Sequence, residues 1–514
     1  MNAAATGGLG RRLAHNTLHA ATGRIAAVAV WLFLTPPILA ALGTDGFAVW
    51  ALFFALTGYF AALDLGLVQG TLRHVSAARA RGASEEAAAF VTLGVAGFVL
   101  LGLAWSGAVL LLRGPLLEWL RLPESQRGAA TFAMQAGALV FVLAGTANVL
   151  GAALQGHDRF DLANVVSLTA TLMQGAGILA ALAAHAGLYG LVLAVGAGWA
   201  AAALLAAGLL AARVPEARFA GWSLARHHAR EALAFGGPMQ LASLFAVLHA
   251  HLDKFLLPGL VTLAAVTPYE LGSRVLGALQ TFPQMLLLAM LPAASTMHAT
   301  GDATRLRALY VRGERYLLTA TALLVAALTG PAARLFAVWL GPGHADAALV
   351  LRGLTVATAL TLATGMASVS TRAIGRPALE AWYGAVTLVT HVVTSLLLLP
   401  RFGLAGAVFA AIATTAVAST VFLVGVARAL GWRVTDVIGV PHVRPAAAAA
   451  LGAGAGFALD RLLPVSGGAA GWAWLACAGA GAVVVSAGVC VATGYFPWRE
   501  ALALATRRRG AEGA

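Results

Sequence analysis

Residues 154–162, with the sequence LQGHDRFDL, begin a pattern that this 514-residue chain uses twice. They precede an apolar run, after which the motif GLYG occupies residues 187–190. The same order returns as AIGRPALE at residues 373–380, an apolar run, and GLAG at residues 403–406. The corresponding glycines lie 219 and 216 residues apart. An internal repeat of this size is typical of membrane transporters built from two related lobes.

The composition indicates a polytopic membrane protein. Hydrophobic residues make up 60% of the chain and charged residues only 10%, with a mean hydropathy of +0.85, which excludes a soluble globular or disordered protein. The chain holds fourteen apolar runs, each near the ~20 residues that a spanning helix needs, and no gap between them could hold a soluble domain. Small residues inside these runs predict close helix packing, for example Gly94, Gly97, Gly102 and Gly107.

The repeat predicts an all-α fold of about fourteen transmembrane helices with three parts. Each copy of the repeat holds six apolar runs, an even number, so both copies should have the same orientation in the membrane. We therefore predict an N-lobe at residues 1–212, a C-lobe at 213–430, and two extra helices with a cytoplasmic tail at 431–514.

Basic residues predict the orientation. Of the 33 lysines and arginines, 24 fall in loops on one side of the predicted membrane and 7 on the other. Since positive residues concentrate in cytoplasmic loops, both termini are predicted to be cytoplasmic. The net charge of +13 is therefore a topology signal, and no nucleic-acid partner is predicted.

Several ordered motifs resemble those of Wzx-type polysaccharide flippases, members of the multidrug/oligosaccharidyl-lipid/polysaccharide exporter superfamily. They are LGTDGFAVW at 42–50, YFAALDLGL at 59–67 with Arg73, LQGHDRF at 154–160, FGGP at 235–238, LDK at 252–254 and YELGSR at 269–274. The resemblance implies a flippase of the inner membrane that moves undecaprenyl-diphosphate-linked oligosaccharide from the cytoplasmic to the outer leaflet. It also implies membrane lipids, and the polymerase and glycosyltransferases of the same pathway, as partners.

The sequence contains none of the common enzyme or cofactor motifs. There is no HExxH, no cysteine pair at metal spacing and no P-loop, so neither a cofactor nor a metal is predicted. His249, His251 and Asp253 do not share one helical face, which argues against a metal site. Two other functions remain open: a drug or cation antiporter of the same fold, and a membrane-embedded polymerase. The longest outer loop, at about 113–128, is predicted to form only a short interfacial helix around Trp119, which disfavours a polymerase.

Charged residues at membrane depth are the candidates for substrate binding. Arg274 lies about 12 Å inside the predicted outer boundary, where a charge costs at least ~2.5–3.5 kcal/mol unless it faces protein or water. Glu270 lies one helical turn earlier and can pair with it while the substrate cavity is empty. We predict that Arg274 exchanges Glu270 for the substrate's diphosphate; the alternative is a permanent structural pair. Arg24, at the start of the first span, is a second diphosphate ligand or only a topology anchor.

Further polar residues complete the predicted site. Asp64 is either a substrate ligand or the partner of Arg24 or Arg73 in a structural ion pair. The sugars need a polar cavity, to which we assign Gln240, Gln280 and Gln284. Proton coupling is assigned to His391, Asp253 and His249, with simpler alternatives: His391 as a neutral hydrogen-bonded histidine, and Asp253 with Lys254 as a pair that reaches the outer interface.

Overall fold

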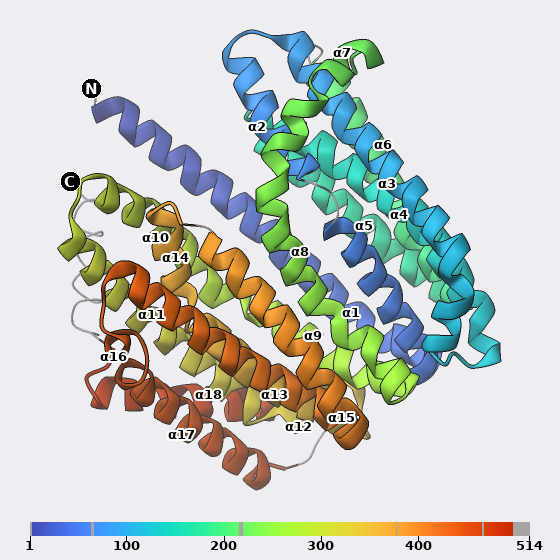
Figure 1. Ribbon diagram of the computed structural model, residues 1–514. Helices are drawn as coiled ribbons and strands as arrows, with labels where there is room; N and C mark the ends of the chain where they lie inside the picture. Colours follow the sequence, from blue (N-terminus) through green and yellow to red (C-terminus); the bar gives the residue numbers. More distant parts are fainter. Residues whose placement is uncertain (1–2, 63–65, 215–218, 377, 465–466, 497–514) are drawn as a thin grey trace. The chain divides into compact units, whose positions relative to one another are not determined.

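The computed structural model describes residues 3–62, 66–214, 219–376, 378–464 and 467–496 (Figure 1). Side chains are described within these ranges except at the helical positions 3–26, 59–62, 231–243, 288–289 and 440. All regular elements in the described ranges are helices, so the predicted all-α membrane fold is confirmed. By their internal contacts the residues form two compact units, Met1–Thr267 and Pro268–Ala514.

The first unit contains eight α-helices in its described part. They are α1 (Ala3–Ala62), α2 (Leu67–Ala80), α3 (Ser84–Trp119), α4 (Glu124–Gly156), α5 (Phe160–Ala183), α6 (Gly187–Arg213), α7 (Trp222–His227) and α8 (Ala229–Leu260), followed by the 3-10 turn η2 (Leu263–Ala265). The helix α9 (Val266–Leu279) begins at the end of this unit and continues into the second. The predicted boundary at 212/213 stays a prediction; the contacts group α8 with the first unit.

Small residues bring α3 close to α4, and the two helices lie side by side in Figure 1. A methyl group added at Gly94 would lie 2.8 Å from Val149 Cγ1, and one at Gly102 would overlap Val142. The buried Trp105 fits against Gly137 and donates its indole N–H to the Met134 carbonyl at 3.0 Å. The glycines therefore act in packing, as expected, whereas a methyl group at Gly107 would meet open space.

The segment around Trp119 differs from its prediction. The expected interfacial helix does not form separately, because α3 continues through Pro115 to Trp119 and α4 starts at Glu124. Pro115 is accommodated inside this long helix. The Trp119 indole donates a hydrogen bond of 2.9 Å to the Phe255 carbonyl of α8, and its ring lies against Gly259. Through these contacts the carboxyl end of α3 packs against α8.

The first glycines of the two GLxG motifs have nearly the same positive φ angle, which supports the internal repeat. Gly187 has φ of 56°, and Gly403 has φ of 57°. Both values lie in the left-handed region that other residues rarely adopt, so each motif requires glycine at its first position. Gly187 starts α6, and Gly403 kinks α15 (Ala378–Leu430), whose 53 residues therefore form two successive helices. The repeat marks corresponding helix–helix turns.

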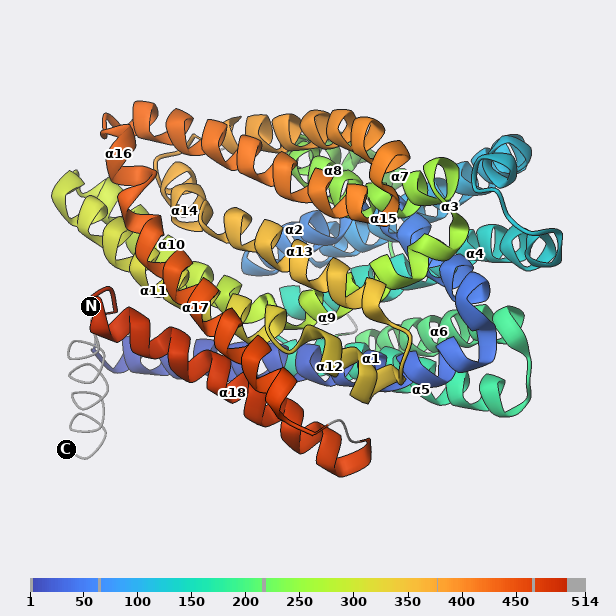
Figure 2. The same cartoon turned by 90° about the horizontal axis from the view of Figure 1, so that it is seen from below.

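The second unit continues with nine α-helices after α9 in its described part. They are α10 (Thr281–Ala299), α11 (Ala303–Thr329), α12 (Ala332–Leu340), α13 (Ala345–Leu362), α14 (Gly365–Ala373), α15, α16 (Val434–Val437), α17 (Val440–Leu462) and α18 (Gly468–Ala492). The helices α17 and α18 pack against each other and against α11, as Figure 2 also shows. A methyl group at Gly452 would lie 2.6 Å from the Ala482 carbonyl, so glycine allows this close approach. The last two helices thus belong to the second unit.

The helices suit a membrane. Eight described helices are long and apolar enough to cross one, and two further pairs, each bent at a short break, qualify as single spans. The long kinked helix α15 is counted once among the eight, although about 1.5 Å per residue gives it roughly 80 Å, more than twice a ~30 Å hydrocarbon core. The chain is a multi-pass membrane protein; the count of fourteen stays a prediction.

Candidate substrate-binding site

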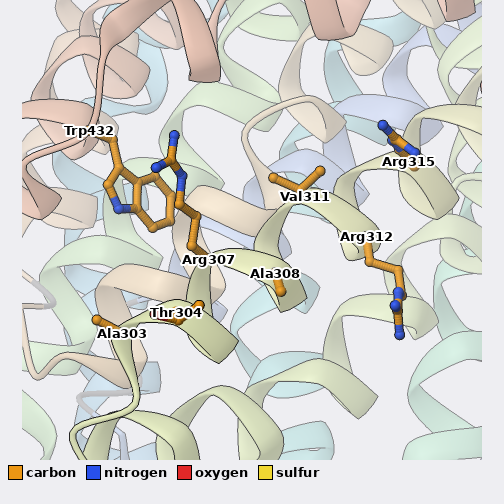
Figure 3. A pocket seen from close by; sticks show the side chains of 8 residues that line it. All are labelled: Ala303, Thr304, Arg307, Ala308, Val311, Arg312, Arg315 and Trp432. Atoms are coloured by element: carbon orange, nitrogen blue, oxygen red, sulfur yellow. The ribbon is translucent and has the colours of Figure 1, made fainter.

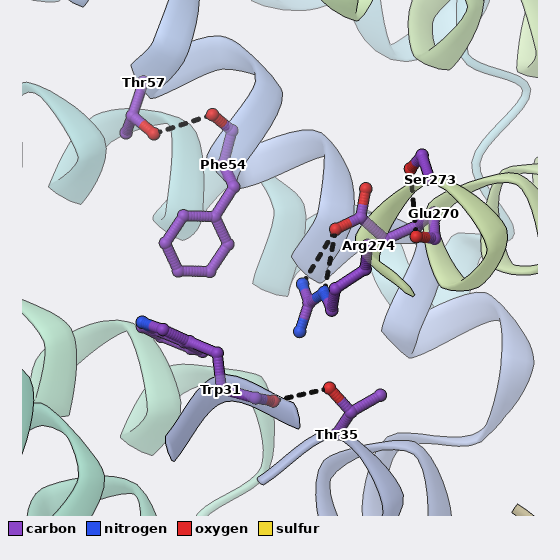
Figure 4. Close-up of polar contacts among 7 residues, drawn as sticks. All are labelled: Trp31, Thr35, Phe54, Thr57, Glu270, Ser273 and Arg274. Atoms are coloured by element: carbon purple, nitrogen blue, oxygen red, sulfur yellow. Dashed lines mark hydrogen bonds and ion pairs between the residues drawn. The ribbon is translucent and has the colours of Figure 1, made fainter. Parts of the chain in front are cut away.

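An ion pair between Glu270 and Arg274 lies on α9 (Figure 4). Arg274 donates to the same carboxylate oxygen, Oε1, from Nη2 at 2.8 Å and from Nε at 3.2 Å. The side chains are 13% and 8% exposed, so the pair is largely removed from solvent. The contact has the i,i+4 geometry that the sequence predicts, and it lies within one helix.

Two small residues, Gly272 and Ser273, lie between Glu270 and Arg274 in the sequence of α9. Ser273 donates its hydroxyl to the Glu270 carbonyl at 3.0 Å, so its polar group is satisfied inside α9 (Figure 4). A methyl group at Gly272 would lie 2.7 Å from Val350 Cγ1 and 2.9 Å from the Leu351 nitrogen. Glycine therefore lets α9 approach the backbone of α13 on the side of α9 opposite the two charged residues, because position 272 is two residues from each of them.

In its described part the structure does not show contacts between the Glu270–Arg274 pair and the other predicted substrate ligands. Asp64 lies outside the described residues, as do the side chains of Arg24 and Gln240. Gln280 directly follows α9 and is half-buried, whereas Gln284 on α10 is exposed. Their assignment to a sugar-binding cavity stays a prediction.

The polar cluster at the end of α8 is more buried than the sequence suggests. Asp253 is 2% exposed and Lys254 is 7% exposed, so protein encloses both side chains, and their placement as a pair at the outer interface stays a prediction. Depth along a helix does not reveal which neighbours cover it, and here other parts of the chain enclose both residues. His249 is half-buried, and His251 packs against Gly58 of α1. Among the described residues, no three His, Cys, Asp or Glu side chains gather closely enough to hold a metal ion.

The buried His391 joins the two halves of α15. Its Nδ1 lies 3.3 Å from the Thr414 hydroxyl, which in turn lies 2.9 Å from the Thr394 hydroxyl. His391 and Thr394 precede the kink at Gly403, and Thr414 follows it. A hydrogen-bonded imidazole between helices is the simpler of the two roles considered from the sequence, and this geometry favours it. Proton coupling through His391 stays a prediction.

The sequence did not single out Arg334, a buried arginine that holds α12 to the end of α17. Its guanidinium binds Asp460 Oδ1 at 2.5 Å and donates to the carbonyls of Asp460, Leu463 and Pro464 at 2.6, 2.9 and 2.7 Å. These carbonyls lie at the carboxyl end of a helix, where a cation is favoured. Arg334 and Asp460 are 126 residues apart, so no local pattern could have linked them.

A family model described as "Polysaccharide biosynthesis protein" matches residues 46–343, more than half of the chain. The chain belongs to this polysaccharide biosynthesis family. The match includes most of the predicted N-lobe together with Glu270 and Arg274. The search of curated proteins found no match to the chain.

Solved structures show which fold the chain has. A lipid II flippase, MurJ, in an inward closed conformation matches with a TM-score of 0.68 and 12% identity, over 95% of this chain and 99% of that one. A multidrug resistance MATE family transporter of the MOP superfamily matches in its inward-facing conformation with a TM-score of 0.67 and 15% identity, over 79% of this chain and 94% of that one. An outward-facing MATE transporter gives 0.57 and 16% identity, over 81% and 95%.

These matches confirm the resemblance expected from the motifs. The family is one of polysaccharide biosynthesis, and the fold is that of MOP-superfamily transporters and flippases. The related folds belong to proteins that move molecules across membranes.

Proposed function

We propose that this protein is a flippase that moves undecaprenyl-diphosphate-linked oligosaccharide from the cytoplasmic to the outer leaflet of the inner membrane. Transport proceeds by alternating access, and both termini are cytoplasmic. Membership of a polysaccharide biosynthesis family supports a saccharide cargo, and a fold like that of MurJ supports a lipid-linked one.

The observation that carries the proposal is the Glu270–Arg274 pair on α9. A purely structural charge pair is seldom favoured in an apolar environment, since apolar residues of similar size serve equally well there. Arginine presents paired N–H groups that match phosphate oxygens, so Arg274 is suited to a diphosphate. Because the Glu270–Arg274 bond lies within one helix, it can break and re-form without separating helices.

The sugars and the polyprenyl tail of the cargo do not require charged ligands. The sugars need hydrogen-bonding side chains, and the half-buried Gln280 next to α9 offers an amide. The polyprenyl tail can stay in the bilayer during transport. Arg24, Asp64, Gln240 and Gln284 remain the other proposed ligands of the cargo.

A deletion strain tests the function directly. Loss of the protein should cause lipid-linked oligosaccharide to accumulate on the cytoplasmic leaflet, and the intact gene should restore surface polysaccharide. The location of the sugar is measured by its accessibility to an added, membrane-impermeant glycosidase in spheroplasts. Normal export in the deletion strain would contradict the proposal.

The similarity to MATE transporters makes a small-molecule antiporter the main alternative. That function predicts increased drug sensitivity in the deletion strain, with surface polysaccharide intact. A polymerase is less well supported, because only Leu120–Pro123 separates α3 from α4 where the longest outer loop was expected. Extension of oligosaccharide chains by the purified protein would support the polymerase function.

A further inference from the structure

A cavity of about 680 Å³ lies along α11, in the second unit (Figure 3). It is separate from the Glu270–Arg274 pair, and no residue of α9 lines it. Its lining consists of Ala303, Thr304, Arg307, Ala308, Val311, Arg312, Arg315 and Trp432. A volume in the range of about 300–1,000 Å³ is usual for small-molecule sites.

The lining is strongly basic. Arg307, Arg312 and Arg315 project from one helix, and the lining contains no carboxylate. Asp436 binds Arg307 from beside the cavity at 2.5 Å, but both side chains are substantially exposed, so this contact is easily exchanged. Arg315 is exposed and makes no ion pair with any described residue. The lining therefore contributes three arginines and no acidic side chain.

An aromatic residue stands at one end of this arginine row. Trp432 and Arg307 lie together at one end of the drawn stretch of α11, and Arg312 and Arg315 lie towards the other (Figure 3). The Trp432 ring packs edge-on against Tyr310, with centroids 4.9 Å apart, so its position is fixed. A neighbouring hollow of about 490 Å³ shares Arg307 and Arg315, adds Arg444 of α17, and is also lined by the carboxylates Glu314 and Asp436.

The position of the cavity indicates the source of its ligand. All four arginines belong to the side of the membrane that the arginine distribution predicts to be cytoplasmic, near the ends of long apolar helices. Tryptophan is enriched at this level of a membrane, and the 40% exposed Val311 adds an apolar wall. Basic pockets between helices at the cytoplasmic surface suit the headgroups of anionic lipids.

We propose that this cavity binds the phosphate-bearing headgroup of an anionic glycerophospholipid. The arginines contact the phosphate oxygens, and the apolar side chains contact the glycerol and the start of the acyl chains. The inference does not depend on the proposed flippase activity, because it concerns another helix and a lipid that is not the cargo.

Binding of short-chain lipids to the purified full-length protein tests the site. Dioctanoyl phosphatidylglycerol and dioctanoyl phosphatidylcholine are titrated in neutral detergent and followed by native mass spectrometry. The test variant is Arg307→Gln/Arg312→Gln/Arg315→Gln. The matched control, Arg213→Gln/Arg226→Gln/Arg230→Gln, removes three exposed arginines of the same predicted side that do not line the cavity.

The wild type and the control should bind phosphatidylglycerol at least about tenfold more tightly than phosphatidylcholine, and the triple variant should lose this preference. Should the triple variant fail to fold, Arg315→Gln breaks no described ion pair and should weaken phosphatidylglycerol binding by about threefold to fivefold. An unchanged preference in the arginine variants overturns the proposal. So does binding of inorganic phosphate or undecaprenyl diphosphate at the cavity without binding of phosphatidylglycerol.

Discussion

Arg274 and Arg334 are both largely buried in the second unit, yet they are bonded in opposite ways. Arg334 spans two helices, binding the Asp460 carboxylate and three carbonyls at the end of α17. Arg274 binds a carboxylate one turn away on its own helix. Breaking the first set of bonds removes a connection between α12 and α17, whereas the Glu270–Arg274 bond itself joins no two helices. Burial alone therefore does not identify a functional arginine. What separates the two is whether the bonded carboxylate lies on the same helix, as for Arg274, or on another helix, as for Arg334.

The largest effect on stability is expected for Arg334→Ala. This change leaves the Asp460 carboxylate nearly buried without its cation and removes three bonds to helix-end carbonyls. The expected loss is about 3–5 kcal/mol, measured as the thermal unfolding of the purified protein in detergent. Arg461→Ala is the control, because Arg461 is exposed and only covers the Phe457 ring at 5.0 Å. Equal stability of the two variants would show that the bonds of Arg334 between α12 and α17 do not stabilise the protein.

Glu270→Gln should have a smaller effect on stability. It removes a negative charge bonded to Arg274, but the Arg274 side chain is 13% exposed and the amide oxygen can still accept a hydrogen bond. We expect a loss of about 1–3 kcal/mol in the same unfolding experiment. A loss as large as that of Arg334→Ala would mean that the α9 pair is also structural.

The smallest effect is expected for His391→Gln. Glutamine can keep a hydrogen bond to the Thr414 hydroxyl between the two halves of α15, so stability should fall by less than about 1 kcal/mol. The pH dependence of transport, measured in proteoliposomes, should be the same as in the wild type. A shifted or flattened pH profile with normal folding would instead support the proton-coupling role.

The sequence predicts best what depends on local spacing. The composition predicts a helical membrane protein, the motifs predict the family, and the i,i+4 spacing predicts the Glu270–Arg274 contact. The two GLxG motifs are recognisable from the sequence alone. The positive φ angles of Gly187 and Gly403 give the physical reason why glycine recurs there.

The sequence fails where a contact joins distant parts of the chain. The clamp between Arg334 and Asp460 has no local signature. The burial of Asp253 and Lys254 depends on what packs around α8, which depth along the helix does not reveal. The arginines of α11 were recognised only as topology signals, because nothing in the spacing shows that Trp432 lines a cavity beside them.

The double variant Glu270→Gln/Arg274→Gln tests the central claim most directly. Removing both charges leaves no lone buried ion, so the protein should fold with a stability close to that of the wild type. The measurement is the rate at which purified protein in proteoliposomes exposes undecaprenyl-diphosphate-linked oligosaccharide to an external glycosidase, with Arg401→Gln, an exposed arginine of α15, as control. The account predicts at least a tenfold slower rate for the folded double variant and a normal rate for the control. A folded double variant that transports at the normal rate would contradict it.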